Sequence, residues 1–163
     1  MVFDTIGGGS VPPGAAKHRG VNFMSQYLNF FVRHDKEFVP IADYSRSTTV
    51  YSEVNAPYGK IRKFDREELR AIAERLRAGK KFAKSQIKAV NYRLKLIAGA
   101  NNSLEEKLDV INSELELIDE YKEDIQTLDR YAYELDFIAE MTYDNEVFAG
   151  IEIGEPTEED ILE

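Results

Sequence analysis

The charge of this chain reverses between two consecutive segments that each carry apolar residues at helical spacing. Residues 56–97 contain 13 Lys and Arg against 4 Asp and Glu, whereas residues 98–163 contain 3 against 21. A short turn of Gly, Ala and Asn, residues 99–102, separates the two. Opposite charge favours the folding of one helix back onto the other. The pattern therefore predicts an antiparallel helical hairpin with a charge zipper between its arms.

The first arm begins with a capping box, because Asp65 can cap a helix N-terminus and Glu68 follows three residues later. The position between Leu76 and Ala83 in its apolar stripe falls on Gly79 or Lys80, and glycine weakens a helix interior. We therefore expect two helical pieces, over residues 66–78 and 81–98, which could be collinear. The apolar stripe of this arm consists of Leu69, Ile72, Leu76, Ala83, Ile87, Val90, Leu94 and Ile97.

The second arm has a clearer capping box, Ser103 with Glu106. Its apolar residues alternate nearly throughout between spacings of three and four, which is typical of a coiled-coil seam. A helix over residues 104–141 would be about 57 Å long, which exceeds the size of a compact domain of this length. Something from this chain or another should therefore cover its far end. The seam consists of Leu104, Leu108, Ile111, Leu115, Ile118, Tyr121, Ile125, Leu128, Ala132, Leu135 and Ile138.

Residues 24–64 read as a small β element. Aromatic and β-branched residues on both sides of a polar turn at 34–37 predict a β-hairpin over residues 26–42, and Pro40 predicts that its second strand is an edge. Residues 45–54 leave two alternatives, a third strand or a short helix capped by Ser45, of which we prefer the helix. Residues 60–64 are expected to be a basic connector.

The two ends of the chain differ from the rest. Glycine and proline break any period in residues 1–23, which predicts a disordered tail and suggests Met24 as the native start. Residues 146–153 predict a short strand that could pair with the β-hairpin, and residues 154–163 a mobile acidic tail. The expected fold is α+β and mostly α, in four parts: a tail (1–23), a small β element with a short helix (24–64), a long coiled-coil-like helical hairpin (65–143), and a strand with an acidic tail (144–163).

The composition disfavours a membrane span and any site that depends on cysteine. No apolar run approaches the ~18 residues of a membrane span, and the chain does not start with a secretory pattern. The absence of cysteine excludes disulfides, thiolate metal sites and cysteine nucleophiles, so a reducing cytoplasmic setting is expected.

Catalytic motifs are equally scarce. The only histidines, His18 and His34, are too far apart in sequence to match a metal-site pattern. Acids four residues apart, such as Glu116 and Glu120, can hold a divalent metal, but here they continue the polar face of a helix and no ExxH motif accompanies them. We therefore expect no enzyme activity, cofactor, metal or small-molecule substrate.

Two charged faces are candidates for binding. Surplus acid on the second arm could face a basic partner, and the basic run on the first arm could contact phosphate, although we prefer the interpretation that this run satisfies the acidic helix and solvent. The acidic candidates are Glu114, Glu116, Asp119, Glu120, Glu123 and Asp124, and the phosphate-binding candidates are Lys80, Lys81, Lys84 and Lys88.

These features favour a non-enzymatic interaction or assembly protein that binds a protein partner or itself. Small size, high charge and the lack of a catalytic motif are also typical of small phage and prophage proteins. Two alternatives stay open: an acidic DNA mimic that inhibits a nucleic-acid enzyme, and nucleic-acid binding through the basic helix. The second of these is less favoured because the net charge is −9.

Overall fold

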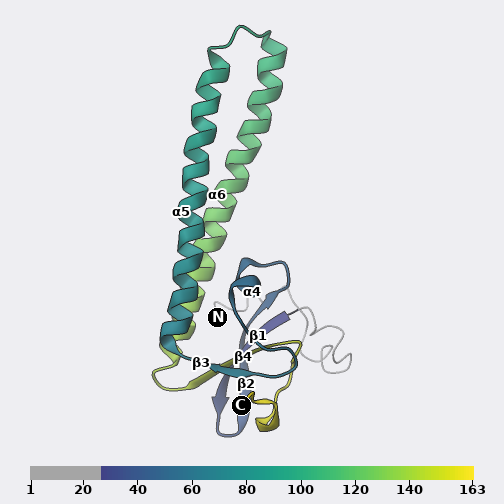
Figure 1. Cartoon of the computed structure of the whole chain (residues 1–163), viewed down its shortest axis with the longest axis vertical. Coiled ribbons are helices and arrows are strands. Elements are labelled where there is room, and N and C mark those ends of the chain that lie inside the picture. Colours follow the sequence, from purple (N-terminus) through teal and green to yellow (C-terminus); the bar gives the residue numbers. More distant parts are fainter. Residues whose placement is uncertain (1–26) are drawn as a thin grey trace. The chain divides into compact units, whose positions relative to one another are not determined.

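The computed structural model describes residues 27–163, so the predicted tail over 1–23 and the suggested start at Met24 lie outside the described residues. The fold is α+β and mostly α, as predicted (Figure 1). The chain divides into a sheet unit, which contains the described residues up to Glu74 together with Tyr133–Glu163, and a hairpin unit, Arg75–Ala132. The elements in order are β1 (Tyr27–His34), β2 (Glu37–Ser45), α4 (Thr49–Glu53), β3 (Arg62–Phe64), α5 (Arg66–Ala98), α6 (Leu104–Met141), β4 (Glu146–Ile151) and the 3-10 helix η1 (Glu158–Asp160).

The sheet unit is built on four antiparallel strands in the order β2-β1-β4-β3. The predicted hairpin is confirmed as β1 and β2, and β2, which contains Pro40, is an edge strand as expected. The predicted C-terminal strand is also confirmed, and it pairs with β1 on one side and β3 on the other. β4, which follows the two long helices in the chain, therefore lies inside the sheet between β1 and β3.

Both faces of the sheet are covered, which explains why β1 and β4 contain runs of buried residues. Successive residues point to opposite faces. Phe30 packs with Tyr44 and Phe64 on one face, and the Tyr44 hydroxyl donates to Oε1 of the buried Glu134 in α6 at 3.3 Å. The other face buries a cluster formed by Phe31, Ile61, Phe148 and Ile153, with Phe38 and Ile161 against it.

The prediction of a mobile C-terminal tail was wrong. Residues after β4 return along Ile61, whose backbone N–H donates to the Asp160 carbonyl at 2.9 Å and whose carbonyl accepts from Leu162 N–H at 2.7 Å. The prediction that residues 60–64 are only a connector was also wrong, because Arg62–Phe64 form β3 against β4. Both segments are ordered by partners far away in sequence and cover apolar side chains of the sheet.

The preferred helix over residues 45–54 is confirmed as α4, but its cap is Thr48 and not Ser45. The Thr48 hydroxyl accepts from the backbone N–H of Tyr51 at 3.2 Å. Ser45 instead ends β2 and offers its carbonyl to Thr48. The sheet therefore extends closer to the helix than the sequence indicated.

In the hairpin unit, α5 and α6 pack as an antiparallel pair. Lys80 contacts Asp129 at 2.7 Å and Arg93 contacts Glu114 at 2.8 Å. Arg93 follows Lys80 by 13 residues while Glu114 precedes Asp129 by 15, so the two helices advance nearly in step. The buried seam includes Leu76, Ala83, Val90, Ile118 and Ala132.

The predicted interruption at Gly79 and Lys80 is wrong, because α5 is one continuous helix. Gly79 lies on the seam, where a Cβ atom added to it would be 3.4 Å from Cδ1 of Leu128. Packing against α6 compensates for the roughly 0.5–1 kcal/mol that glycine costs in a helix. The capping box of α6 is confirmed: Glu106 N–H donates to the Ser103 hydroxyl, and the Glu106 carboxylate accepts from Ser103.

Among the residues that the structure describes, no helix is both long enough and apolar enough to cross a bilayer.

Gly150 and Gly79 provide a matched pair of stability tests. A Cβ atom at Gly150 would be 2.0 Å from the Lys60 carbonyl oxygen, so Gly150→Ala must displace backbone and should lower the free energy of unfolding by about 1–3 kcal/mol or more. Gly79→Ala has room and should raise it by about 0.5–1 kcal/mol. Urea denaturation measures both, and equal effects would contradict the close approach at β4.

Glu106 provides a pH test of the cap. The Ser103 hydrogen bonds lower the pKa of Glu106 below its ordinary value, so the cap's contribution is complete above that ordinary value and is lost as pH falls through the lowered pKa. Ser103→Ala should move the pKa of Glu106 back up, as measured by carboxyl NMR titration. Ser113→Ala, on the same helix, should leave it unchanged. An unshifted Glu106 in Ser103→Ala would refute the cap.

Candidate functional site

The structure separates one of the six acidic candidates from the others. Glu114 accepts hydrogen bonds from Arg93 Nε and Nη2 at 2.8–3.2 Å, its side chain is 15% exposed, and the pairing raises the pKa of Arg93. The remaining five side chains are exposed and have no ion-pair partner within residues 27–163. These five, hereafter the acidic face, are Glu116, Asp119, Glu120, Glu123 and Asp124.

The basic candidates divide in the same way. Lys80 is occupied by Asp129 on α6. Lys81, Lys84 and Lys88 are exposed on the outside of α5 and, like Lys95 further along, have no acidic partner in the described part of the chain. Adjacent residues on a helix differ in direction by about 100°, so Lys80 can face α6 while Lys81 faces away from it.

The expected charge zipper is therefore only part of the arrangement. Lys80–Asp129 and Arg93–Glu114 link the helices in the hairpin unit, and Arg70–Glu140 links them in the sheet unit. Exposed pairs of this kind contribute roughly 0–1 kcal/mol each. Apolar burial along the seam holds the arms together, and the unpaired lysines and acids are left for contacts outside the hairpin.

A second apolar stripe runs along the outside of α5 and was missed in the sequence. Phe82, Tyr92 and Leu96 are 62%, 64% and 58% exposed. They share a coiled-coil spacing with three small exposed residues, and at about 100° per residue this stripe lies away from the seam. A search for a second heptad period would have found it. The outer stripe consists of Ala78, Phe82, Ser85, Ala89, Tyr92 and Leu96.

α6 also exposes apolar side chains near its N-terminus. Leu104, Leu108 and Leu115, which were assigned to the seam, are 72%, 47% and 45% exposed. Helical periodicity places them about 100° away from the residues that face α5, on the side where the exposed acids Glu105, Asp109 and Asp119 lie. The far end of the hairpin therefore presents leucine beside unpaired acid on α6, and aromatic residues and leucine beside unpaired lysine on α5.

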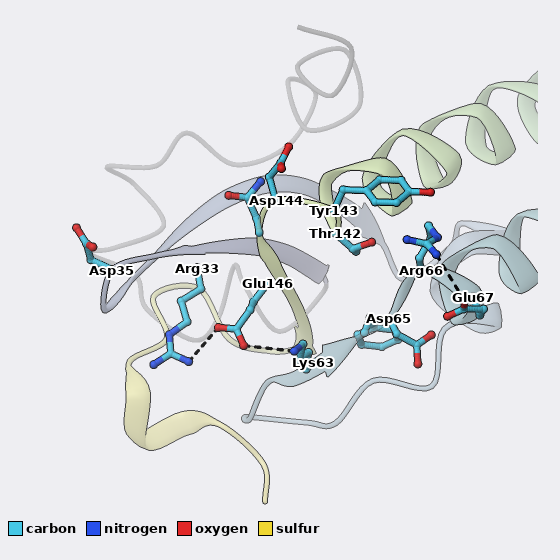
Figure 2. Close-up of a pocket in the computed structure, with 12 residues that line it drawn as sticks. Arg33, Asp35, Lys63, Asp65, Arg66, Glu67, Thr142, Tyr143, Asp144 and Glu146 are labelled. Carbon is cyan, nitrogen blue, oxygen red and sulfur yellow. Dashed lines mark hydrogen bonds and ion pairs between the residues drawn. The ribbon is translucent and has the colours of Figure 1, made fainter.

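The sheet unit contains an open cavity of about 760 Å³, shown in Figure 2. Each of its three cationic side chains already has a partner. Glu146 receives both Arg33 and Lys63, at 3.2 and 3.3 Å, and Arg66 stacks 4.2 Å from the ring centre of Tyr143. All three cations are engaged, and the described lining also carries five acids, so the cavity offers no free cation to an anionic ligand. The acids are Asp35, Asp65, Glu67, Asp144 and Glu146.

The structure places one of the two histidines of the sequence. His34 is exposed at the end of β1, and His18 lies outside the described residues. Within residues 27–163, no group of three or more His, Cys, Asp or Glu side chains could hold a metal ion.

Comparisons of the chain with protein-family models, with curated proteins and with solved structures found no match in any of the three.

Stability measurements can test whether the outer stripe is exposed to solvent within one chain. Phe82→Ala removes a large side chain that is mostly in solvent and should change the free energy of unfolding by less than about 0.5 kcal/mol. Val90→Ala removes less volume from a side chain that is 1% exposed and should cost about 1–2 kcal/mol. Chemical denaturation of dilute protein measures both. A larger loss for Phe82→Ala would mean that the stripe is covered within the chain.

Proposed function

We propose that this chain is a non-enzymatic interaction or assembly protein that contacts its partner through the outside of the hairpin formed by α5 and α6. The observation that carries the proposal is the outer stripe: three large apolar side chains, each more than half exposed, beside lysines that have no acidic partner in the described chain. Contiguous exposed apolar surface of this kind marks interaction sites in soluble proteins.

The composition of the outer stripe supports a helical partner. The stripe mixes its three large side chains with the small residues Ala78, Ser85 and Ala89. Small residues allow a partner helix to approach closely, and large ones fit between its side chains. Aromatic residues are also enriched in protein interfaces, and rim charges select the partner. Under this proposal catalysis is absent, and the charges of the cavity in the sheet unit serve to hold β1, β3 and β4 together.

The acidic face supports a second candidate, imitation of a nucleic-acid backbone. Its five carboxylates lie within three helical turns and are not neutralised by any described residue. Such a rod could occupy the DNA-binding site of another protein, and binding by this face should weaken steeply as salt rises. Retained binding after Glu120→Gln and Asp124→Asn, or binding insensitive to salt, would reject this candidate.

The main proposal is tested by the retention of partners. Phe82→Ser, Tyr92→Ser and Leu96→Ser in one chain should abolish complexes that the wild-type chain forms, either with itself or with a protein from its host, as measured by native mass spectrometry after affinity capture. A matched control, Val39→Ser, Tyr133→Ser and Leu162→Ser, removes comparably exposed apolar side chains outside the hairpin unit. The control should keep the complexes. Complexes undiminished in the first variant would contradict the proposal.

A further inference from the structure

We infer that the partner of the outer stripe is a second copy of this chain, whose α6 docks on α5 with its exposed leucines against the stripe and the acids alongside those leucines next to the lysines. The inference rests on the proposed function and names the partner. Both surfaces lie in the hairpin unit.

The α5 surface combines an apolar line with charge along one side. Phe82, Tyr92 and Leu96 supply the large side chains. Lys81, Lys88 and Lys95 follow one another at intervals of seven residues, so they form a row parallel to the stripe. Such a row lies where the flanking charges of a coiled coil select a partner helix, and a complementary partner must carry acid in the corresponding row.

The α6 surface has the complementary composition. Leu104, Leu108 and Leu115 form an exposed apolar line. Along the side of this line that faces away from α5 lies a row of exposed acids that have no ion-pair partner in the described chain, Glu105, Asp109 and Glu116. From Leu104 to Leu115 the line extends about 17 Å, and the stripe from Phe82 to Leu96 extends about 21 Å. The two surfaces therefore match in length as well as in charge.

Charge decides which pairing of exposed surfaces forms. Pairing of α5 with α5 would bring two lysine rows together, and pairing of α6 with α6 would bring two rows of acids together; both are disfavoured by like-charge repulsion. Pairing α5 of one copy with α6 of another neutralises both rows and covers apolar side chains on both helices. Within one chain the two surfaces cannot meet, because α5 and α6 already use their seam-facing sides for each other.

Reciprocal charge reversal tests this pairing. The lysine-reversed chain carries Lys81→Glu, Lys88→Glu and Lys95→Glu, and the acid-reversed chain carries Glu105→Lys, Asp109→Lys and Glu116→Lys. Each alone should associate with itself at least about tenfold more weakly than the wild type, because both of its surfaces then have the same charge. An equal mixture of the two should regain association, since one chain then offers acid where the other offers lysine. Analytical ultracentrifugation and native mass spectrometry measure the assemblies.

Two controls keep the result specific. Lys36→Glu, Arg46→Glu and Lys60→Glu reverse three exposed cations of the sheet unit and should leave association unchanged. Circular dichroism should show that each reversed chain keeps the helix content of the wild type, which places any loss in the interface and not in folding.

Failure of this inference can be distinguished from failure of the proposed function. A wild-type chain that is strictly monomeric at its highest soluble concentration overturns the inference. So does a mixture of folded reversed chains that stays monomeric. A host protein that still depends on Phe82, Tyr92 and Leu96 would then preserve the proposed function with a different partner, whereas loss of that dependence as well would remove both.

Discussion

The apolar seam between α5 and α6 is the interaction on which the arrangement of the hairpin unit depends. Ala83 and Val90 on one helix and Ile118 on the other are buried there, and continuous burial along the seam keeps α5 helical through Gly79. Once this side of each helix is committed, helical geometry directs the other residues outward at fixed angles. The seam therefore determines which lysines and acids are paired and which are exposed.

The sheet unit depends on a different constraint, the pairing of segments that are distant in sequence. β4 follows α6 and lies between β1 and β3, and the chain after it covers Phe31 and Phe148 on one face of the sheet. Gly150 allows the Lys60 carbonyl to approach β4 closely. The salt bridges around Glu146 then join β1, β3 and β4 at the edge of the cavity. The residues of these salt bridges also line the cavity.

The sequence predicted what local patterns determine. The capping box at Ser103, the edge strand that contains Pro40 and the two helical arms all follow from residues close together in the chain. β3 and the ordered C-terminal segment could not be predicted in this way, because three residues at 62–64 acquire strand geometry only when β4 lies beside them. Gly79 was misjudged because its cost depends on the Leu128 side chain that packs against it. The binding candidates were chosen by counting charges in each segment, and such a count does not distinguish paired from unpaired side chains. Lys80 and Lys81 are the same residue type, yet Lys80 contacts Asp129 and Lys81 faces solvent.

The seam and the exposed surfaces beside it all require that α5 folds back on α6, and a distance between two labels tests this most directly. The chain has no native cysteine, so Lys88→Cys and Glu120→Cys, both exposed, accept spin labels without competition. Antiparallel helices about 8–10 Å apart place these labels within roughly 30 Å of each other. Pulsed electron–electron double resonance on dilute labelled chains mixed with unlabelled protein should give that short distance. A distance near 48 Å, which a single continuous helix of 32 residues would produce, would contradict the seam and every surface derived from it.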